Sequence, residues 1–271
     1  MYKYFDTHAH LQMKDYDEDR EELIKNLQAE NIGVVVVGVD KETSFEAVVL
    51  AEKYENVFAT IGYHPQDSQE EFRGEDLSEL IKNPKVVAVG ECGLEFLAPF
   101  EKGRQRRPSS PTGLSDMEKQ RQVNLFKKQI DFAIKYEKPL VIHCRDAHHE
   151  VLEILKEKKV LVGEKLRGVI HFFSGDLDIA KQYLDLGFYL SFGGVLTFTR
   201  DYDEVVKFVP LEKILPETDA PFVAPVPYRG QRNSPLYIKE VVKRIAEIKQ
   251  IGLIEVENAL ISNILRIFCL A

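Results

Sequence analysis

Short runs of β-branched and apolar residues alternate with longer amphipathic stretches along almost the whole chain. This alternation is typical of strands joined by crossover helices, and therefore of a parallel sheet. Eight strand-helix units within 271 residues match the (β/α)8 TIM barrel, an α/β fold, and we expect a single domain over residues 1–271. The expected strands are Tyr4 to Thr7, Val34 to Val37, Val57 to Ile61, Val86 to Gly90, Leu140 to Ile142, Val169 to Ile170, Tyr189 to Phe192 and Ile214 to Pro216.

The clearest helical pattern between these strands runs from Met117 to Tyr136. Phe126 and Ile130 lie on one face of it, as residues four apart do in a helix. Ser115 and Glu118 have the spacing of a capping box, which predicts that the helix begins directly after Ser115. Further amphipathic stretches are Arg20 to Glu30 and Phe45 to Glu55.

Six side chains that can bind a metal ion lie where expected strands stop. Because TIM-barrel active sites gather at the C-terminal ends of the strands, these side chains should face one another. The first two are imidazoles two residues apart, which point to the same side of a strand. A His-x-His pair alone is weak evidence, but six ligands at strand ends indicate a metallohydrolase. They are His8, His10, Glu91, His143, His171 and Asp219.

Strand alternation also predicts the place of two cysteines. If Glu91 and His143 point into the barrel mouth, then Cys92 and Cys144 point outward to the helix layer. There a free cysteine behaves as a small apolar side chain, so we expect both to contribute packing and no catalytic thiol.

Composition limits the classes of protein further. A net charge of −8 argues against a protein that coats nucleic acid, although bound divalent ions could still make a nuclease cleft positive. No apolar run approaches the about 18 residues that span a bilayer, and no basic leader precedes the first expected strand. Three cysteines without a Cys-x-x-Cys pair suit a reducing compartment. We therefore expect a cytoplasmic protein without membrane association, and the sequence indicates no protein partner.

Several blocks of the sequence are similar to those of a known family. They are Asp6-Thr7-His8-Ala9-His10-Leu11, Gly62-Tyr63-His64-Pro65, Gly90-Glu91-Cys92-Gly93-Leu94, His143-Cys144-Arg145-Asp146-Ala147, His171-Phe172-Phe173-Ser174-Gly175 and Glu217-Thr218-Asp219-Ala220-Pro221. Taken together, in this order and over nearly the whole chain, they resemble the TatD family of metal-dependent deoxyribonucleases. One position departs from the pattern: the family usually has aspartate where this chain has Glu95, one methylene longer.

The resemblance implies a centre with two divalent metal ions. A carboxylate suits the bridging place, because its two oxygens can hold two ions about 3.5 to 4 Å apart. The mixture of imidazole and carboxylate ligands fits Zn, Mn or Co, and Mg less well, and the sequence does not choose among them. One ion would be held by His8, His10, Glu91 and Asp219, and the second by Glu91, His143 and His171.

The resemblance also implies hydrolysis of DNA phosphodiester bonds by a water that the two metals activate. Asp219 would steer or deprotonate this water, and Glu91 would hold both ions. We expect Arg145 and His64 to contact the phosphate. His64 could instead cap a loop, and Arg145 could instead pair with a ligand carboxylate. Because no groove-reading element is apparent, we expect nucleotides to be removed from DNA ends.

Two other functions remain open. Related barrels with nearly the same ligands hydrolyse other esters or amides, such as a lactone, a cyclic amide or an aminoacyl ester on RNA. Those enzymes often bridge their metals with a modified lysine on the fourth strand, so Glu91 favours the nuclease. A non-catalytic scaffold should have lost ligands, and all six are present here.

Two segments lie outside these motifs. The long stretch from Phe96 to Leu114 contains the basic run Lys102 to Arg107, which could contact a phosphate backbone or be a neutral solvated insertion. The stretch Ser262 to Phe268 is similar to the closing helix of the family, and we expect it to pack beneath the barrel.

Overall fold

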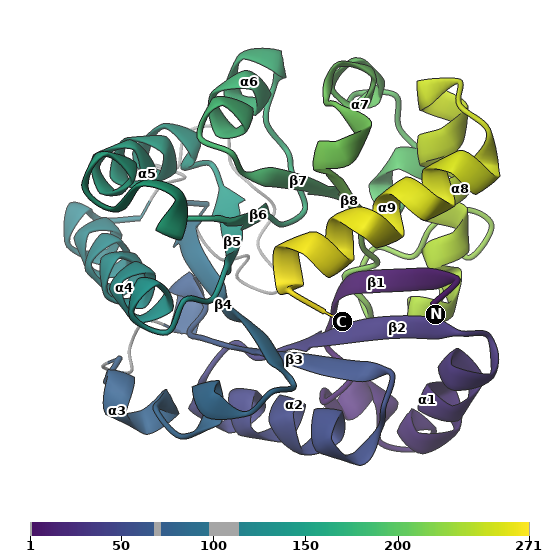
Figure 1. The fold of residues 1–271 in the computed structure, drawn as a ribbon, viewed down its shortest axis with the longest axis horizontal. Helices are drawn as coiled ribbons and strands as arrows, with labels where there is room; N and C mark the ends of the chain where they lie inside the picture. The colour runs from purple at the N-terminus through teal and green to yellow at the C-terminus, as the bar shows by residue number, and fades with distance from the viewer. Residues whose placement is uncertain (1, 68–71, 98–113, 271) are drawn as a thin grey trace.

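Eight parallel strands lie side by side in sequential order and curve into a barrel surrounded by helices (Figure 1). They are β1 (Tyr4–Ala9), β2 (Ile32–Val37), β3 (Val57–Ile61), β4 (Val86–Glu95), β5 (Leu140–Arg145), β6 (Gly168–Ile170), β7 (Tyr189–Phe192) and β8 (Ile214–Pro216). This computed structural model describes residues 2–67, 72–97 and 114–270. The barrel closes where Ala9 pairs with Ala220, whose carbonyl accepts a 2.7 Å hydrogen bond from the His10 N–H. The predicted TIM barrel is confirmed.

Helices cover the outside of the barrel (Figure 1). Within the described residues they are α1 (Arg20–Ala29), α2 (Lys41–Lys53), α3 (Gly74–Leu77), α4 (Asp116–Lys135), α5 (His148–Val162), α6 (Leu177–Asp185), α7 (Asp203–Phe208), α8 (Ile238–Lys249) and α9 (Leu253–Phe268). The predicted capping box begins α4: the Ser115 hydroxyl accepts the Glu118 N–H, and the Glu118 carboxylate accepts the Ser115 N–H. None of these helices combines the length and apolarity that a bilayer span requires.

Three strands run further than the sequence indicated. The expected ends of β1, β4 and β5 were too early, so His8, Glu91 and His143 lie within strands and do not follow them. Polar residues continue these strands because neighbouring strands pair with them, as the register of Glu95 opposite Arg145 shows. Pairing of this kind overrides the weak strand preference of single residues.

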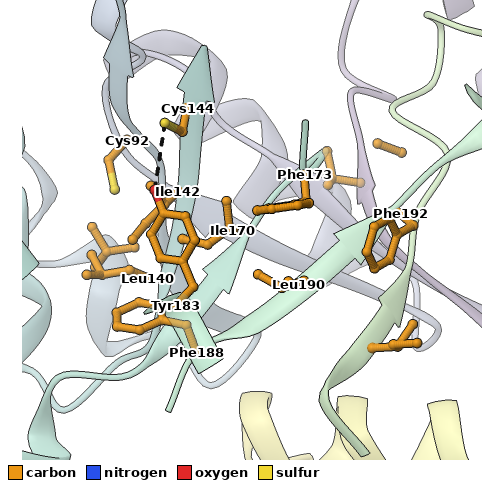
Figure 2. Packing of buried hydrophobic residues seen from close by; sticks show 14 of the residues in the cluster. Cys92, Leu140, Ile142, Cys144, Ile170, Phe173, Tyr183, Phe188, Leu190 and Phe192 are labelled. Carbon is orange, nitrogen blue, oxygen red and sulfur yellow. Dashed lines mark hydrogen bonds between the residues drawn. The ribbon is translucent and has the colours of Figure 1, made fainter. Parts of the chain in front are cut away.

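The layer between the sheet and the helices forms the larger apolar core. Every residue of β2 and of β4 is buried, because one face of each strand lines the barrel and the other meets helices. Figure 2 shows Cys92 and Cys144 among apolar side chains of this layer, with the Tyr183 hydroxyl 3.8 Å from the Cys144 Sγ. The prediction that both cysteines serve packing is confirmed.

The final helix closes one end of the barrel. In Figure 1, α9 crosses the barrel end beside both chain termini. Its residues Ile264, Ile267 and Phe268 pack against side chains from the strand interiors, as predicted. That interior set is Phe5, Val35, Val37, Val87, Ala88, Val141, Val169, Tyr189 and Leu215. The C-terminal ends of the strands lie at the opposite end of the barrel.

Candidate metal centre

The predicted ligands gather around Glu91 at the C-terminal mouth of the barrel. The Glu91 Oε2 lies 3.4 Å from the His8 Nε2 and 3.8 Å from the His10 Nε2. The Asp219 Oδ1 lies 3.9 Å and 3.6 Å from the same two nitrogens, which are 3.2 Å apart. In a tetrahedral site with bonds of about 2.0 to 2.1 Å, donor atoms are about 3.3 Å from one another. Small shifts of these four side chains would therefore enclose one ion.

The other carboxylate oxygen of Glu91 faces a second group of imidazoles. The Glu91 Oε1 lies 2.8 Å from the His143 Nδ1 and 3.7 Å from the His171 Nε2. The His64 Nε2 lies 3.6 Å from the same oxygen. The structure thus brings all six predicted ligands together, and Glu91 presents one oxygen to each of two groups, which fits a bridging carboxylate.

Hydrogen bonds between β1 and the segment after β8 hold Asp219 opposite His8. The Asp6 carboxylate accepts the His8 N–H at 3.1 Å and the Thr218 N–H at 2.9 Å, and burial raises the pKa of Asp6 to about 8. Asp219 itself has a φ of 56°, which is uncommon for a residue with a side chain. Its N–H donates to the His8 carbonyl at 2.9 Å, and this bond helps to hold the turn.

In each imidazole, the hydrogen bond made by the ring nitrogen that points away from Glu91 determines which nitrogen is available to a metal ion. The His10 Nδ1 lies 3.0 Å from the Val37 carbonyl, which only accepts, so Nδ1 carries the proton and Nε2 offers a lone pair. The His143 Nε2 donates likewise to the Glu95 carboxylate at 3.1 Å, so Nδ1, which donates to Glu91 at 2.8 Å, is the nitrogen on which a metal ion would replace the proton. Metal-ligating histidines typically have such partners. His8 differs, because its Nδ1 has no hydrogen-bond partner within the described residues.

Glu217 is a functional candidate that the sequence reasoning did not single out. Its Oε2 accepts from the His171 Nδ1 at 3.0 Å and from the Ser191 hydroxyl at 2.6 Å, and its Oε1 accepts the Phe172 N–H at 2.7 Å. Because these donors already engage both oxygens, Glu217 suits a partner that orients His171 better than a metal ligand. Its position in the same sequence block as Asp219 was the available signal.

The facing histidines lower the pKa of two candidate ligand carboxylates, Glu91 and Asp219. Burial raises the pKa of Glu91, but the facing imidazoles of His64 and His8 and the hydrogen bond from His143 hold it well below its usual range. Burial lowers the pKa of His171, but the carboxylates of Glu217, Glu91 and Asp219 together outweigh this effect and raise it to about 10. An ionised Glu91 is the form that binds cations, and a cation would replace the proton on His171.

His64 and Arg145 lie at the rim of the cluster. The His64 Nδ1 accepts the Gln66 N–H at 3.2 Å, so the neutral ring carries its proton on Nε2, and burial lowers the pKa of His64 to about 3. This imidazole therefore caps its loop and also directs an N–H toward the centre. The Arg145 side chain is 57% exposed, with its Nη1 3.9 Å from the Glu95 carboxylate. The basic run Lys102 to Arg107 lies outside the described residues.

Comparisons with known proteins agree with this geometry. A family model described as TatD related DNase matches residues 5–269. YabD of Bacillus subtilis, described as an uncharacterized metal-dependent hydrolase, is 39% identical over 270 residues, which cover 97% of this chain and 98% of YabD. The crystal structure of the TatD homologue YjjV from Escherichia coli matches with a TM-score of 0.85 and 27% identity over 99% of each chain.

A more distant match extends the likeness of fold. The structure of an uncharacterized amidohydrolase from Saccharomyces cerevisiae has a TM-score of 0.77 and 18% identity, over 99% of this chain and 100% of that chain. The family match and the 39% identical relative both span nearly the whole chain, and the buried His and Glu clusters suit metal binding. The chain therefore belongs to the TatD family and is a metal-dependent hydrolase.

Proposed function

We propose that the chain is a deoxyribonuclease that uses two divalent metal ions to hydrolyse phosphodiester bonds and removes nucleotides from DNA ends. The observation that carries this proposal is the double-sided contact of Glu91. Its Oε2 faces His8 and His10, and its Oε1 faces His143 and His171. Two ions held by one carboxylate suit the in-line displacement of phosphoryl chemistry. The description of the matching family as a DNase supports DNA as the substrate.

The residues of the site have distinct roles in this proposal. Divalent ions, when bound, lower the pKa of a coordinated water and neutralise charge on phosphate oxygens. Glu91 would hold both ions, and His8, His10, His143, His171 and Asp219 would complete the ligand set around this bridge. The donor set fits Zn, Mn or Co and accommodates Mg less well.

Three side chains nearer to solvent would act on the substrate and the water. The Asp219 carboxylate is 17% exposed, so it can orient the attacking water and accept its proton. The exposed Arg145 guanidinium can fork onto phosphate oxygens, as planar guanidinium groups commonly do. The His64 Nε2–H can donate a hydrogen bond to the same phosphate. We place this activity in the cytoplasm, because the free cysteines suit a reducing compartment.

Cleavage of end-labelled DNA tests the proposal. The protein is stripped with a chelator, reloaded separately with Zn, Mn, Co or Mg, and given single- and double-stranded DNA, and neutral esters and cyclic amides in parallel. We expect shortening from labelled ends by the wild type and a loss of at least about 100-fold in Glu91→Ala, since several kcal/mol of charge stabilisation disappear. Equal turnover by both proteins, or activity on esters and amides alone, would refute the nuclease.

A further inference from the structure

Two phenylalanine rings in the segments that follow β7 and β8 remain exposed. Phe222 is 48% exposed and Phe198 is 41% exposed. Phe198 follows the short helix Gly194–Thr197 after β7, and Phe222 lies three residues after Asp219. Burial of a phenyl ring is favourable, so an exposed ring next to a site offers an apolar face on which a ligand can pack.

Phe222 is held directly beside the candidate metal ligands. Its ring centroid lies 6.2 Å from that of His10, with an angle of 66° between the ring planes. Its N–H donates to the Asp219 carbonyl at 2.8 Å, and its own carbonyl accepts from the Asn233 side chain at 2.5 Å. These bonds fix the backbone at both sides of the residue. A ligand at the metal centre can therefore reach the ring within the length of one nucleotide.

The guanidinium group of Arg229 stacks on the Phe198 ring. The Arg229 guanidinium carbon lies 3.9 Å from the Phe198 ring centroid, and its Nη1 donates to the Ala224 carbonyl at 3.0 Å. The Val226 N–H donates to the Thr197 hydroxyl at 2.8 Å, which ties the β7 and β8 segments together. A stacked guanidinium beside exposed phenyl rings is a combination that recognises bases and phosphates.

We propose that Phe222, Phe198 and Arg229 form a nucleotide-stacking shelf next to the metal centre. Phe222 stacks on the base of the nucleotide whose phosphate lies at the centre, and Phe198 with Arg229 holds the adjoining nucleotide. The ligand class is an unpaired nucleobase in a single strand or a frayed end, because interior bases of a duplex are stacked on both faces, whereas an unpaired base can turn one face to a ring. This inference rests on the proposed nuclease function and adds how the substrate is oriented.

Oligonucleotides with and without a terminal base separate stacking from catalysis. One strand ends in 2-aminopurine, whose fluorescence falls when it stacks, and a matched strand ends in an abasic tetrahydrofuran residue. Binding is measured in a Glu91→Ala background, so that cleavage does not interfere. In this background we expect quenching of 2-aminopurine and tighter binding of the base-bearing strand. Adding Phe222→Ala should abolish the quenching and weaken binding of that strand by about 5- to 150-fold, the range of one base–aromatic stack.

Three comparison variants make the test specific. Phe222→Tyr should restore quenching, because it keeps a ring, whereas Phe222→Leu should not. Phe208→Ala removes another ring that is 48% exposed, at the end of α7, and should change nothing. In proteins with intact Glu91, Phe222→Ala should lower kcat/KM for the base-bearing strand and leave the abasic strand within about 2-fold. The ratio of kcat/KM for the base-bearing strand to kcat/KM for the abasic strand then falls toward one.

The outcomes distinguish this inference from the proposed function. Persistent quenching in the Phe222→Ala variant, or equal losses on base-bearing and abasic strands, would overturn the shelf while leaving the nuclease intact. Quenching by a wild-type protein that hydrolyses no phosphodiester would overturn the nuclease while the shelf stands. An effect of Phe208→Ala as large as that of Phe222→Ala would also overturn the shelf.

Discussion

The two ends of the barrel are buried alike but are built from opposite chemistry. At the closed end, Ile264 of α9 is fully buried among apolar side chains. At the mouth, Glu91 and His171 are 4% and 5% exposed, yet both are ionisable. Burial of apolar surface stabilises a fold, whereas burial of a charge costs free energy unless partners compensate for it. The comparison teaches that the closed end supplies stability and that the mouth holds a costly cluster retained for binding.

The largest expected effect comes from removing the bridge at the mouth. With Glu91→Ala, hydrolysis should fall by about 100-fold or more, because one side chain serves both ligand groups. Metal that binds only the folded state raises its stability by about 2.7 kcal/mol at 100 times the Kd. We therefore expect added metal to raise the melting temperature of the wild type and not of the variant. Cooperative unfolding of the variant in chelator shows that it is folded. If added metal then raised its melting temperature as much as that of the wild type, the bridging role of Glu91 would be contradicted.

A substitution at the closed end should lower stability and leave hydrolysis and metal binding unchanged. Ile264→Ala should lower the free energy of unfolding by about 2 to 5 kcal/mol, since it leaves a cavity in a fully buried cluster. Urea titration measures this loss. Hydrolysis per folded molecule and the metal-dependent increase in melting temperature should both remain. If Ile264→Ala weakened metal binding as strongly as it weakened folding, the division between the two ends would be wrong.

More of the closed end than of the mouth could be predicted from the sequence. The alternation of apolar strand and helix patterns identified the barrel, and the rule that sites lie at strand ends identified the six ligand candidates. The place of α9 beneath the barrel came from the resemblance of Ser262 to Phe268 to the closing helix of the family. Three strand ends were misplaced, because pairing with neighbours carries β4 as far as Glu95. Residues that orient a ligand, as Glu217 orients His171, are brought to it by the approach of two separate strand ends. No local sequence pattern contains that information. The exposure of Phe222 was equally hidden, because most phenylalanines in such a chain belong to the core.

Glu95 is a 3% exposed carboxylate at the mouth, and its Oε2 accepts from the candidate metal ligand His143 at 3.1 Å while its Oε1 accepts the Leu97 N–H at 3.1 Å. Glu95→Ala removes the acceptor of the His143 Nε2–H and should weaken metal affinity by about 10- to 100-fold, as losses of such partners do. Glu95→Gln keeps a carbonyl acceptor and should lose less. Metal titration by calorimetry measures both. Equal affinity in all three proteins would show that Glu95 serves the substrate and does not orient His143.

The smallest effect is expected at Arg145, which lies at the mouth but is not buried. Its side chain is 57% exposed and its nearest acidic partner among the described residues, Glu95, is 3.9 Å away, so Arg145→Ala should leave the free energy of unfolding within about 0.5 kcal/mol. A single phosphate contact contributes about 0.7 to the slope of log affinity against log salt for single strands, and the variant should lose about that much. Binding of labelled DNA at several salt concentrations checks it, with Lys41→Ala on α2 as the control at a similarly exposed cation. An unchanged slope in Arg145→Ala, together with weaker metal binding, would instead assign Arg145 to holding Glu95 in place and leave phosphate recognition at the mouth to other residues.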